Sequence, residues 1–305
     1  MRQRASVGFR ICLGTDSAQR ASAKMTGRDS KYFFKKGNYG FRLYDPVRDE
    51  EDVCRLCWSN ALPGGRPFPL IPEAGAVSFG RVVTGPFARF APEYFFVADD
   101  RTKGKLIAYL TGAEGSPVET ASGKVSWLSW RDGIARQIAE EEFGEISPKL
   151  YIPAFGFLEG AKFLRTLSLG TRAVQFLLHA KSHNDTEMPK MPQCPEFHFH
   201  VEKGHRGEGI GSKLIEHFVS QFAAAKYKKI CAQVTVCEGQ KPLDYYQGMS
   251  VDGQKLWKIY ERRETTMYSN EEKRVWNLGP RVENVTLVAD KERLLAFVKR
   301  ISSPR

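Results

Sequence analysis

Hydrophobic and polar residues alternate with a period of two in several short segments, and this pattern predicts β-strands. A polar connector, residues 99–104, joins two of these segments, and the glycine near its end predicts a hairpin. The predicted strands are 39–44, 94–98, 105–111, 196–201 and 230–236, with final strands at 256–260 and 265–268.

Apolar residues at helical spacing predict helices between the strands. Asp49 can cap a helix that runs to Asn60, and the buried face of this helix would consist of Val53, Leu56 and Cys57. Six prolines interrupt the stretch from Leu62 to Pro92, which predicts a long loop there. Further helices are predicted at 134–143, 157–179, 212–225 and 242–247.

This alternation of strands and helices predicts a mixed α/β protein in three parts. Residues 1–38 form a basic extension that is disordered or serves as a targeting segment. Residues 39–268 form one domain, with a long insertion at about 113–195. Residues 269–305 form an appendage, in which 285–288 resembles a strand and 290–301 a helix.

The formal charge of +11 is concentrated near the two ends of the chain. Residues 1–42 carry +8 and residues 255–305 carry +5, so the stretch between them carries −2. Basic ends of this kind are more often solvated or targeting segments than nucleic-acid interfaces, so nucleic acid is not the expected partner. No apolar run reaches the roughly 18 residues of a membrane span, and no membrane partner is expected.

Residues 1–28 are rich in Arg, Ser and Ala and contain only Asp16 as an acid. This composition is typical of a mitochondrial or plastid transit peptide, and a disordered extension of a cytoplasmic protein is the alternative. The six cysteines are scattered and indicate reduced thiols. Cys54 and Cys57 form a CxxC pair without a second pair at zinc-finger spacing, so no metal site is predicted.

The segment from Phe197 to Leu214 carries the clearest chemical signal, because a strand, a glycine loop and an amphipathic helix follow one another directly. Glycines at 207, 209 and 211 let main-chain N–H groups approach a ligand, and the helix that follows offers its positive end. These groups together predict a diphosphate site. Two other phosphate loops fail on a required residue: residue 210 is Ile where a Walker A loop needs Lys, and residue 212 is Ser where a dinucleotide loop needs Gly.

The run Arg206-Gly207-Glu208-Gly209-Ile210-Gly211 resembles the (Arg/Gln)-x-x-Gly-x-(Gly/Ala) motif of the GNAT superfamily of N-acetyltransferases. Further along, Tyr245-Tyr246-Gln247-Gly248-Met249-Ser250-Val251 resembles that family's Phe-Tyr-x-x-x-Gly-Phe segment, with Ser250 and Val251 in place of Gly and Phe. The strand pattern Glu196-x-His198-x-His200 is most similar to GNAT-like proteins related to the domain appended to some O-GlcNAc hydrolases.

This resemblance implies a GNAT fold, with a mixed, mostly antiparallel central sheet that splays between its fourth and fifth strands and carries helices on both faces. It implies acetyl-CoA as cosubstrate, with the strand that ends near Val201 pairing with the pantetheine arm. The implied cofactor-binding residues are Phe199, Val201, Arg206, Gly207, Glu208, Gly209, Ile210, Gly211 and Ser212.

The resemblance also implies an acyl-CoA-dependent N-acyltransferase of the EC 2.3.1 type that moves an acetyl group to a primary amine. Alternation places Glu196, His198 and His200 on one face of the strand, opposite Phe197 and Phe199. Glu196 and His198 are the candidate general bases, because the resembling proteins keep a polar pair at those two positions. Tyr246 occupies the position of the family's general acid. A hydrated strand face, or histidines bonded within the core, is the structural alternative for these polar residues.

The acceptor is an amine on a small molecule or a protein, and the chain is expected to act as a monomer or homodimer. A catalytically impaired binding module with the same fold is the alternative function, since some members of the resembling group do not bind acetyl-CoA.

Overall fold

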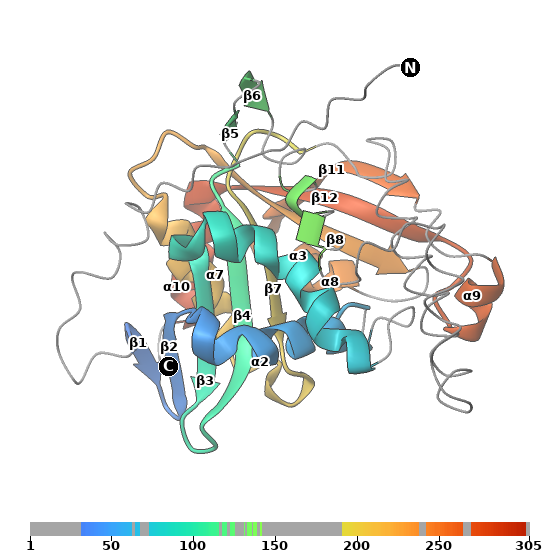
Figure 1. Ribbon diagram of the computed structural model, residues 1–305. Coiled ribbons are helices and arrows are strands. Elements are labelled where there is room, and N and C mark those ends of the chain that lie inside the picture. The colour runs from blue at the N-terminus through green and yellow to red at the C-terminus, as the bar shows by residue number, and fades with distance from the viewer. Residues whose placement is uncertain are drawn as a thin grey trace, which may run out of the picture.

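An eight-stranded sheet forms the centre of the computed structural model (Figure 1). The order of its strands is β1-β2-β3-β4-β7-β8-β12-β11. All neighbouring pairs are antiparallel except β7 and β8, which are parallel. The structure describes residues 32–62, 65–67, 73–115, 118–120, 123–125, 131, 133–135, 137–138, 141, 191–237, 242–264 and 270–302.

Most strands of this sheet match predicted alternating segments, whereas β1 was not predicted and the predicted strand at 265–268 lies outside the described residues. The strands of the sheet are β1 (Phe34–Lys36), β2 (Tyr39–Leu43), β3 (Phe95–Asp100), β4 (Lys105–Ala113), β7 (Glu196–Val201), β8 (Lys229–Cys237), β11 (Trp257–Glu264) and β12 (Val282–Asp290). Two small hairpins lie outside it, formed by β5 (Val118–Thr120) with β6 (Gly123–Val125) and by β9 (Ser250–Val251) with β10 (Gln254–Lys255).

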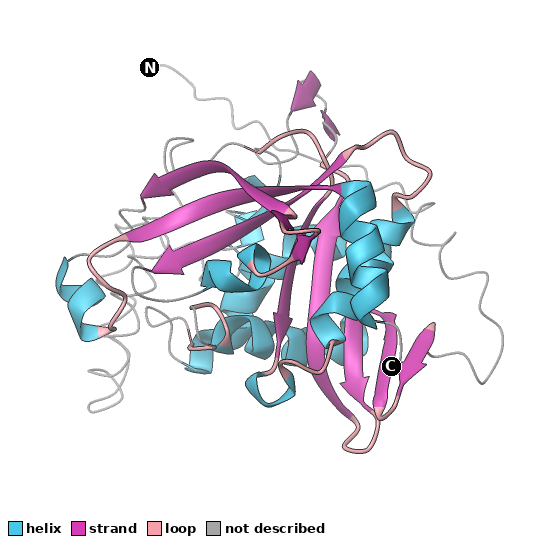
Figure 2. Ribbon diagram, turned by 180° about the vertical axis from the view of Figure 1, so that it is seen from behind, coloured by secondary structure: helices cyan, strands magenta, loops and turns pink. Residues whose placement is uncertain are grey.

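Helices cover both faces of the sheet. Helices α2 and α3 lie on one face (Figure 1), and α7 and α10 pack together on the other (Figure 2). The helices are α2 (Pro46–Ser59), α3 (Ala76–Phe90), α7 (Ile210–Gln221), α8 (Pro242–Gln247), α9 (Asn270–Val275) and α10 (Lys291–Ser302), with 3-10 turns at Glu73–Gly75, Pro92–Tyr94 and Lys203–His205. Within the described residues, no helix has the length and apolar character that crossing a bilayer requires.

The side chains of β3 alternate between two apolar cores, one on each face of the sheet. Phe96 packs in the core that contains Phe218 of α7, whereas Phe95 and Val97 pack in the core that contains Val53 of α2. Complete burial of such a side chain contributes about 1.5–3 kcal/mol. These two layers hold the central strands, and therefore the loops at their ends, in fixed positions.

The prediction of a loop across residues 62–92 is wrong for residues 76–90, which form α3. Phe79, Val82 and Phe87 of this helix are buried, and Pro86 is accommodated inside it. A β-carbon on Gly80 would lie only 2.2 Å from Cα of Cys54, so glycine is required where α3 crosses α2. The prolines and glycines of this segment argued against a helix in the sequence, because α3 is stabilised by close packing rather than by local helix propensity.

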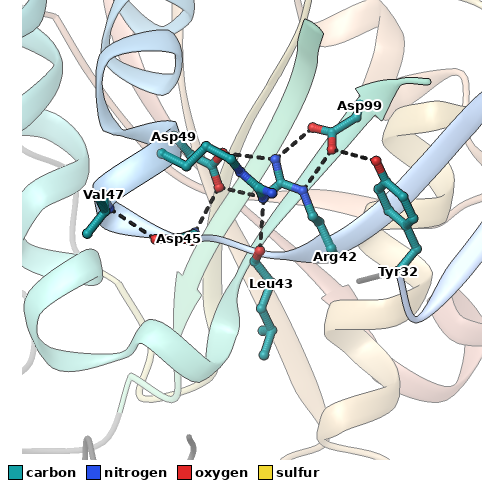
Figure 3. A network of polar contacts seen from close by, with 8 residues as sticks. Tyr32, Arg42, Leu43, Asp45, Val47, Asp49 and Asp99 are labelled. Atoms are coloured by element: carbon teal, nitrogen blue, oxygen red, sulfur yellow. Dashed lines mark hydrogen bonds and ion pairs between the residues drawn. The ribbon is translucent and has the colours of Figure 1, made fainter. Parts of the chain in front are cut away.

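The start of α2 also differs from the prediction. Asp45, not Asp49, is the capping residue, and its side chain accepts a hydrogen bond from the N–H of Val47 at 3.1 Å. Asp49 is buried and instead accepts hydrogen bonds from Arg42 of β2 (Figure 3). Burial acts to raise the pKa of Asp49, but the hydrogen bonds from Arg42 and Arg48 outweigh it and hold that pKa below its usual value. The carboxylate thereby fastens α2 to the sheet.

The sheet includes strands that lie beyond both predicted ends of the domain, residues 39 and 268. The strand β1 pairs with β2, so the described residues of the sheet begin before Tyr39. At the other end, β12 lies between β8 and β11 in the sheet, and α10 packs against α7. The strand and helix predicted near 285–288 and 290–301 are therefore present, but they complete the sheet and its helical layer rather than form an appendage. The predicted helix at 157–179 lies outside the described residues.

The parallel pair β7 and β8 is joined only at its beginning. Glu196 pairs with Cys231 and Phe197 with Ala232, after which the two strands separate while β7 continues to Val201. With β2 counted as the first strand, β7 and β8 are the fourth and fifth. The predicted fold class is confirmed: a mixed, mostly antiparallel sheet that splays between these two strands, with helices on both faces.

Candidate functional site

The glycine loop between β7 and α7 has the backbone that the sequence predicted. Gly207 and Gly209 have φ angles of 85° and 79°, in the left-handed region that favours glycine. A β-carbon on Gly207 would meet nothing within 4 Å, so space is open beside it. A β-carbon on Gly211 would instead lie 2.9 Å from Cε2 of Phe199, so this glycine lets α7 approach β7. The loop leads directly into the first turn of α7, where N–H groups have no partner within the helix.

Alternate side chains of β7 project from opposite faces of the sheet. The ring of Phe197 lies 5.5 Å from that of Phe218 on the α7 face. On the other face, Nε2 of His198 lies 3.0 Å from the hydroxyl of Tyr109 in β4. Glu196 and His200 share the face of His198, because the alternation of a strand is two residues.

Glu196 is held by an arginine that the sequence did not single out. Nη1 of Arg131 lies 2.9 and 3.0 Å from the two carboxylate oxygens of Glu196, which is 3% exposed. Nη2 of Arg131 also donates to Gln233 of β8 at 3.3 Å. Arg131 thus links β7 to β8 across the splay.

The two histidines of β7 lie side by side. Their rings are 4.6 Å apart in an edge-to-face arrangement. Burial, together with the charge of Arg131, lowers the pKa of His198 to about 4. Burial also lowers the pKa of His200 well below its usual value, with further contributions from His198 and Arg206. Both imidazoles are neutral at pH 7.

Comparisons with known proteins give structural similarity only. No protein-family model matches the chain, and no curated protein matches it. Similar solved structures include SsHAT, at 14% identity and a TM-score of 0.41 over 83% of this chain and 98% of that chain. An N-acetyltransferase from Staphylococcus aureus Mu50 has 11% identity and a TM-score of 0.38 over 83% and 99%. The NatC complex bound to Gag peptide and CoA has 12% identity and a TM-score of 0.38 over 83% and 98%.

The sheet itself decides the fold. Its fourth and fifth strands are parallel and separate after two residue pairs, and the glycine loop and α7 follow the fourth strand directly. The chain has a GNAT fold. The loop that joins β7 to α7, residues 202–209, is called the GNAT loop below. It is located at the end of β7, beside the splay, as the motif predicted.

Basic side chains surround the GNAT loop. Nζ of Lys36 lies 3.1 Å from the position of a β-carbon on Gly209, although Lys36 belongs to β1, far away in the sequence. Arg206 folds back, with Nε donating to the carbonyl oxygen of Val201 at 3.1 Å and Nη2 donating to Asn60 at 2.5 Å. Lys36 was missed by the sequence analysis, because nothing in its local pattern relates it to the loop.

The carboxylate of Glu208 contacts two neighbouring side chains. It accepts a hydrogen bond from the hydroxyl of Tyr39 and lies 3.5 Å from Nδ1 of His205. The hydrogen bond to Glu208 is the main reason that the pKa of Tyr39 rises to about 12. The arrangement ties the GNAT loop to β2 and sets its position.

Two adjacent tyrosines of α8 differ in their surroundings. The ring of Tyr246 is 7% exposed and lies 5.2 Å from that of Trp257, and burial raises its pKa well above the usual value. Tyr245 is 42% exposed, and its hydroxyl lies 3.5 Å from the position of a β-carbon on Gly211. Tyr245 therefore reaches the start of α7, whereas Tyr246 packs in the apolar core.

The structure brings the predicted cofactor-binding residues together at one place, the end of β7 and the start of α7. Those on the strand are Phe199 and Val201, and those on the loop and helix are Arg206, Gly207, Glu208, Gly209, Ile210, Gly211 and Ser212. The candidate bases Glu196 and His198 lie on the opposite side of β7 from Phe199.

Proposed function

We propose that this protein is an acyl-CoA-dependent N-acetyltransferase that acetylates a primary amine. The observation that carries the proposal is the GNAT loop, with its left-handed glycines, at the end of β7 after this strand has separated from β8. Acetyl-CoA supplies a thioester whose acetyl carbon accepts the amine nitrogen and whose sulfur leaves with the electrons of the broken C–S bond.

The loop suits the diphosphate of this cosubstrate. N–H groups of its left-handed glycines and of the first turn of α7 attract an anion, and the helix dipole adds to this attraction. Open space beside Gly207 gives a phosphate room to approach the backbone. Lys36 and Arg206 add positive charge at the same place. In this proposal, Phe199 and Val201 offer the freed edge of β7 to the pantetheine arm.

The polar face of β7 supplies the general base. His198 is favoured over Glu196, because Arg131 already occupies the Glu196 carboxylate. The hydroxyl of Thr111, which pairs with His198 across β4 and β7, is buried and has no hydrogen-bond partner among the described residues. A water bonded to that hydroxyl could carry the proton from the amine to His198.

Tyr246 protonates the departing sulfur. Within the described part of the chain, its hydroxyl has no hydrogen-bond partner. The hydroxyl is also not one of the fully buried polar atoms that lack a partner there. A neutral phenol is the form that can donate, and burial keeps it neutral. Tyr245, at the start of α7, is proposed to contact the cosubstrate instead.

Calorimetric titration with acetyl-CoA tests the binding half of this proposal. We expect a one-to-one isotherm that Gly211→Trp abolishes, because any side chain there meets Phe199. Gly204→Ala is the matched control, since a β-carbon on Gly204 meets nothing within 4 Å. Absence of binding by the unaltered protein would overturn the proposal.

The paired carboxylate of Glu196 favours a second candidate, a GNAT-fold binding module that has lost turnover. An assay of free-thiol release and of acceptor mass, across a library of small amines and peptides with acetyl-CoA, separates the two. An enzyme releases thiol and adds an acetyl group to at least one amine. A binding module gives the isotherm without either product.

A further inference from the structure

We infer that Cys57, His198 and His200 form a binding site for a zinc ion between α2 and β7. One possible ligand atom from each residue lies within 4.8 Å of those of the other two. The three come from α2 and from alternate positions of β7, separated by about 140 residues of sequence. The site goes beyond the proposed acetyl transfer and does not depend on it.

The spacing of these ligands is close to that of a zinc centre. A tetrahedral ion with bonds of about 2.3 Å to sulfur and 2.0–2.1 Å to nitrogen holds its ligand atoms about 3.4–3.6 Å apart. The side chains therefore need to close by roughly 1 Å, which small rotations about their side-chain bonds can supply.

The elements that carry the ligands are fixed by the core. Cys57 is 1% exposed and packs in the apolar core between α2 and the sheet. Arg42 fastens the start of α2 through Asp49, and β7 is paired with β4 along its whole length. A site held on a packed helix and an interior strand keeps its geometry better than one on loops.

The donor set favours zinc over the hard cations. A thiolate and two imidazoles are ligands that zinc and related transition metals prefer, whereas magnesium and calcium prefer oxygen ligands. Three protein ligands leave a fourth position for water or another small ligand. The half-buried histidines, rather than the buried Cys57, offer the route by which an ion would enter.

Tyr109 supports the three ligands from β4. Its hydroxyl lies 3.0 Å from Nε2 of His198, and Tyr109 packs in the same apolar core as Cys57. Tyr109 pairs directly with His200 across the two strands, with ring centroids 5.6 Å apart. Groups that contact metal ligands in this way orient them and tune affinity.

Cys54 provides a matched control on the same helix. It is a second cysteine of α2, also 1% exposed, one turn before Cys57. Cys54 is not a member of the three-residue cluster found among the described residues. A metal that simply prefers buried thiols would not distinguish the two positions, whereas the proposed site does.

Titration of the chelator-treated, full-length protein with Co²⁺ and Zn²⁺ tests the inference. We expect one equivalent of Zn²⁺ by elemental analysis and, with Co²⁺, a thiolate-to-cobalt charge-transfer absorption that Zn²⁺ removes. Cys57→Ser should abolish that absorption, and His200→Gln should weaken zinc binding at least ~10-fold, whereas Cys54→Ser should change neither. Tyr109→Phe should weaken binding by ~10- to 100-fold.

Several results would overturn the zinc site. They are an absence of stoichiometric metal in the unaltered protein, equal losses in Cys54→Ser and Cys57→Ser, and an unchanged charge-transfer absorption in Cys57→Ser. Far-ultraviolet circular dichroism and acetyl-CoA titration of each variant show whether it is folded. If metal binds but acetyl-CoA does not, the zinc site stands and the proposed transferase function fails.

Discussion

Arg131 joins the two splayed strands by its contacts to Glu196: one guanidinium nitrogen lies 2.9 and 3.0 Å from the two oxygens of that carboxylate. Its other terminal nitrogen donates to Gln233 on β8. The separation of β7 and β8 is thus bridged by a side chain at the place where backbone pairing ends.

We expect Arg131→Met to destabilise the protein by about 3 kcal/mol, because it leaves the buried carboxylate of Glu196 without its counter-ion. Urea unfolding measures the change. Arg55→Gln is the control, since the Arg55–Glu51 pair is exposed and its loss should cost less than about 1 kcal/mol. Equal losses in the two variants would show that the pair is not buried in solution.

Lys36 is expected to contribute to acetyl-CoA affinity. Lys36→Met should weaken binding about tenfold, the effect of one charged contact, and the loss should shrink at high salt. Lys35→Met is the matched control on the same strand, because neighbouring side chains of a strand point to opposite faces. Calorimetry at two ionic strengths makes the measurement, and equal effects at both positions would exclude a specific role for Lys36.

The two tyrosines of α8 should have separable effects. Tyr246→Phe removes the proposed proton donor, so kcat should fall by ~100-fold or more while acetyl-CoA affinity stays nearly constant. Tyr245→Phe should instead weaken acetyl-CoA binding, because its hydroxyl lies beside the start of α7. Unchanged turnover in Tyr246→Phe would remove Tyr246 from the mechanism.

Stability in acid should depend on Asp49. The pKa of Asp49 is held below its usual value, so its contribution is present above about pH 4 and is lost as the pH falls through the lowered pKa. Asp49→Asn should therefore destabilise the protein at pH 7 and flatten the decline of stability below pH 4. Urea unfolding at pH 7, 4 and 3 gives the comparison. Parallel curves for the two proteins would contradict this role.

Zinc should inhibit acetyl transfer if both proposals hold, because the ion would occupy the imidazole of His198. A chelator should restore turnover, and Cys57→Ser should require more zinc for the same inhibition. Cys54→Ser should behave as the unaltered protein does. If Cys57→Ser needs no more zinc than the unaltered protein for the same inhibition, the inhibitory ion binds at another site.

The part of the fold that local sequence determines was predictable. The succession of β7, the glycine loop and α7 depends on alternation, glycine spacing and an amphipathic run that lie next to one another, and all three are confirmed. Helix α3 was not predictable in this way, because Pro86 lies inside it and Gly80 is required by its packing on α2.

The remainder of the candidate site comes from residues distant in sequence. Lys36, Tyr109 and Arg131 reach the loop or the polar face of β7 from other elements, and no local pattern marks them. The CxxC spacing drew attention to Cys57 together with Cys54. In the structure, however, the possible metal ligands near the sulfur of Cys57 are two histidines of β7 and not Cys54. Such combinations become visible only when the strand order is known.

The place of β12 in the sheet has a consequence for how the protein is made. β8, which forms one wall of the splay, obtains its second strand neighbour from residues 282–290, and β11 joins the sheet only through that same strand. During synthesis, β8 and β11 must wait for residues 282–290 to leave the ribosome, and their unpaired edges can associate with other chains until then. Nascent chains of this protein are therefore expected to need chaperone protection until residues 282–290 have been synthesised.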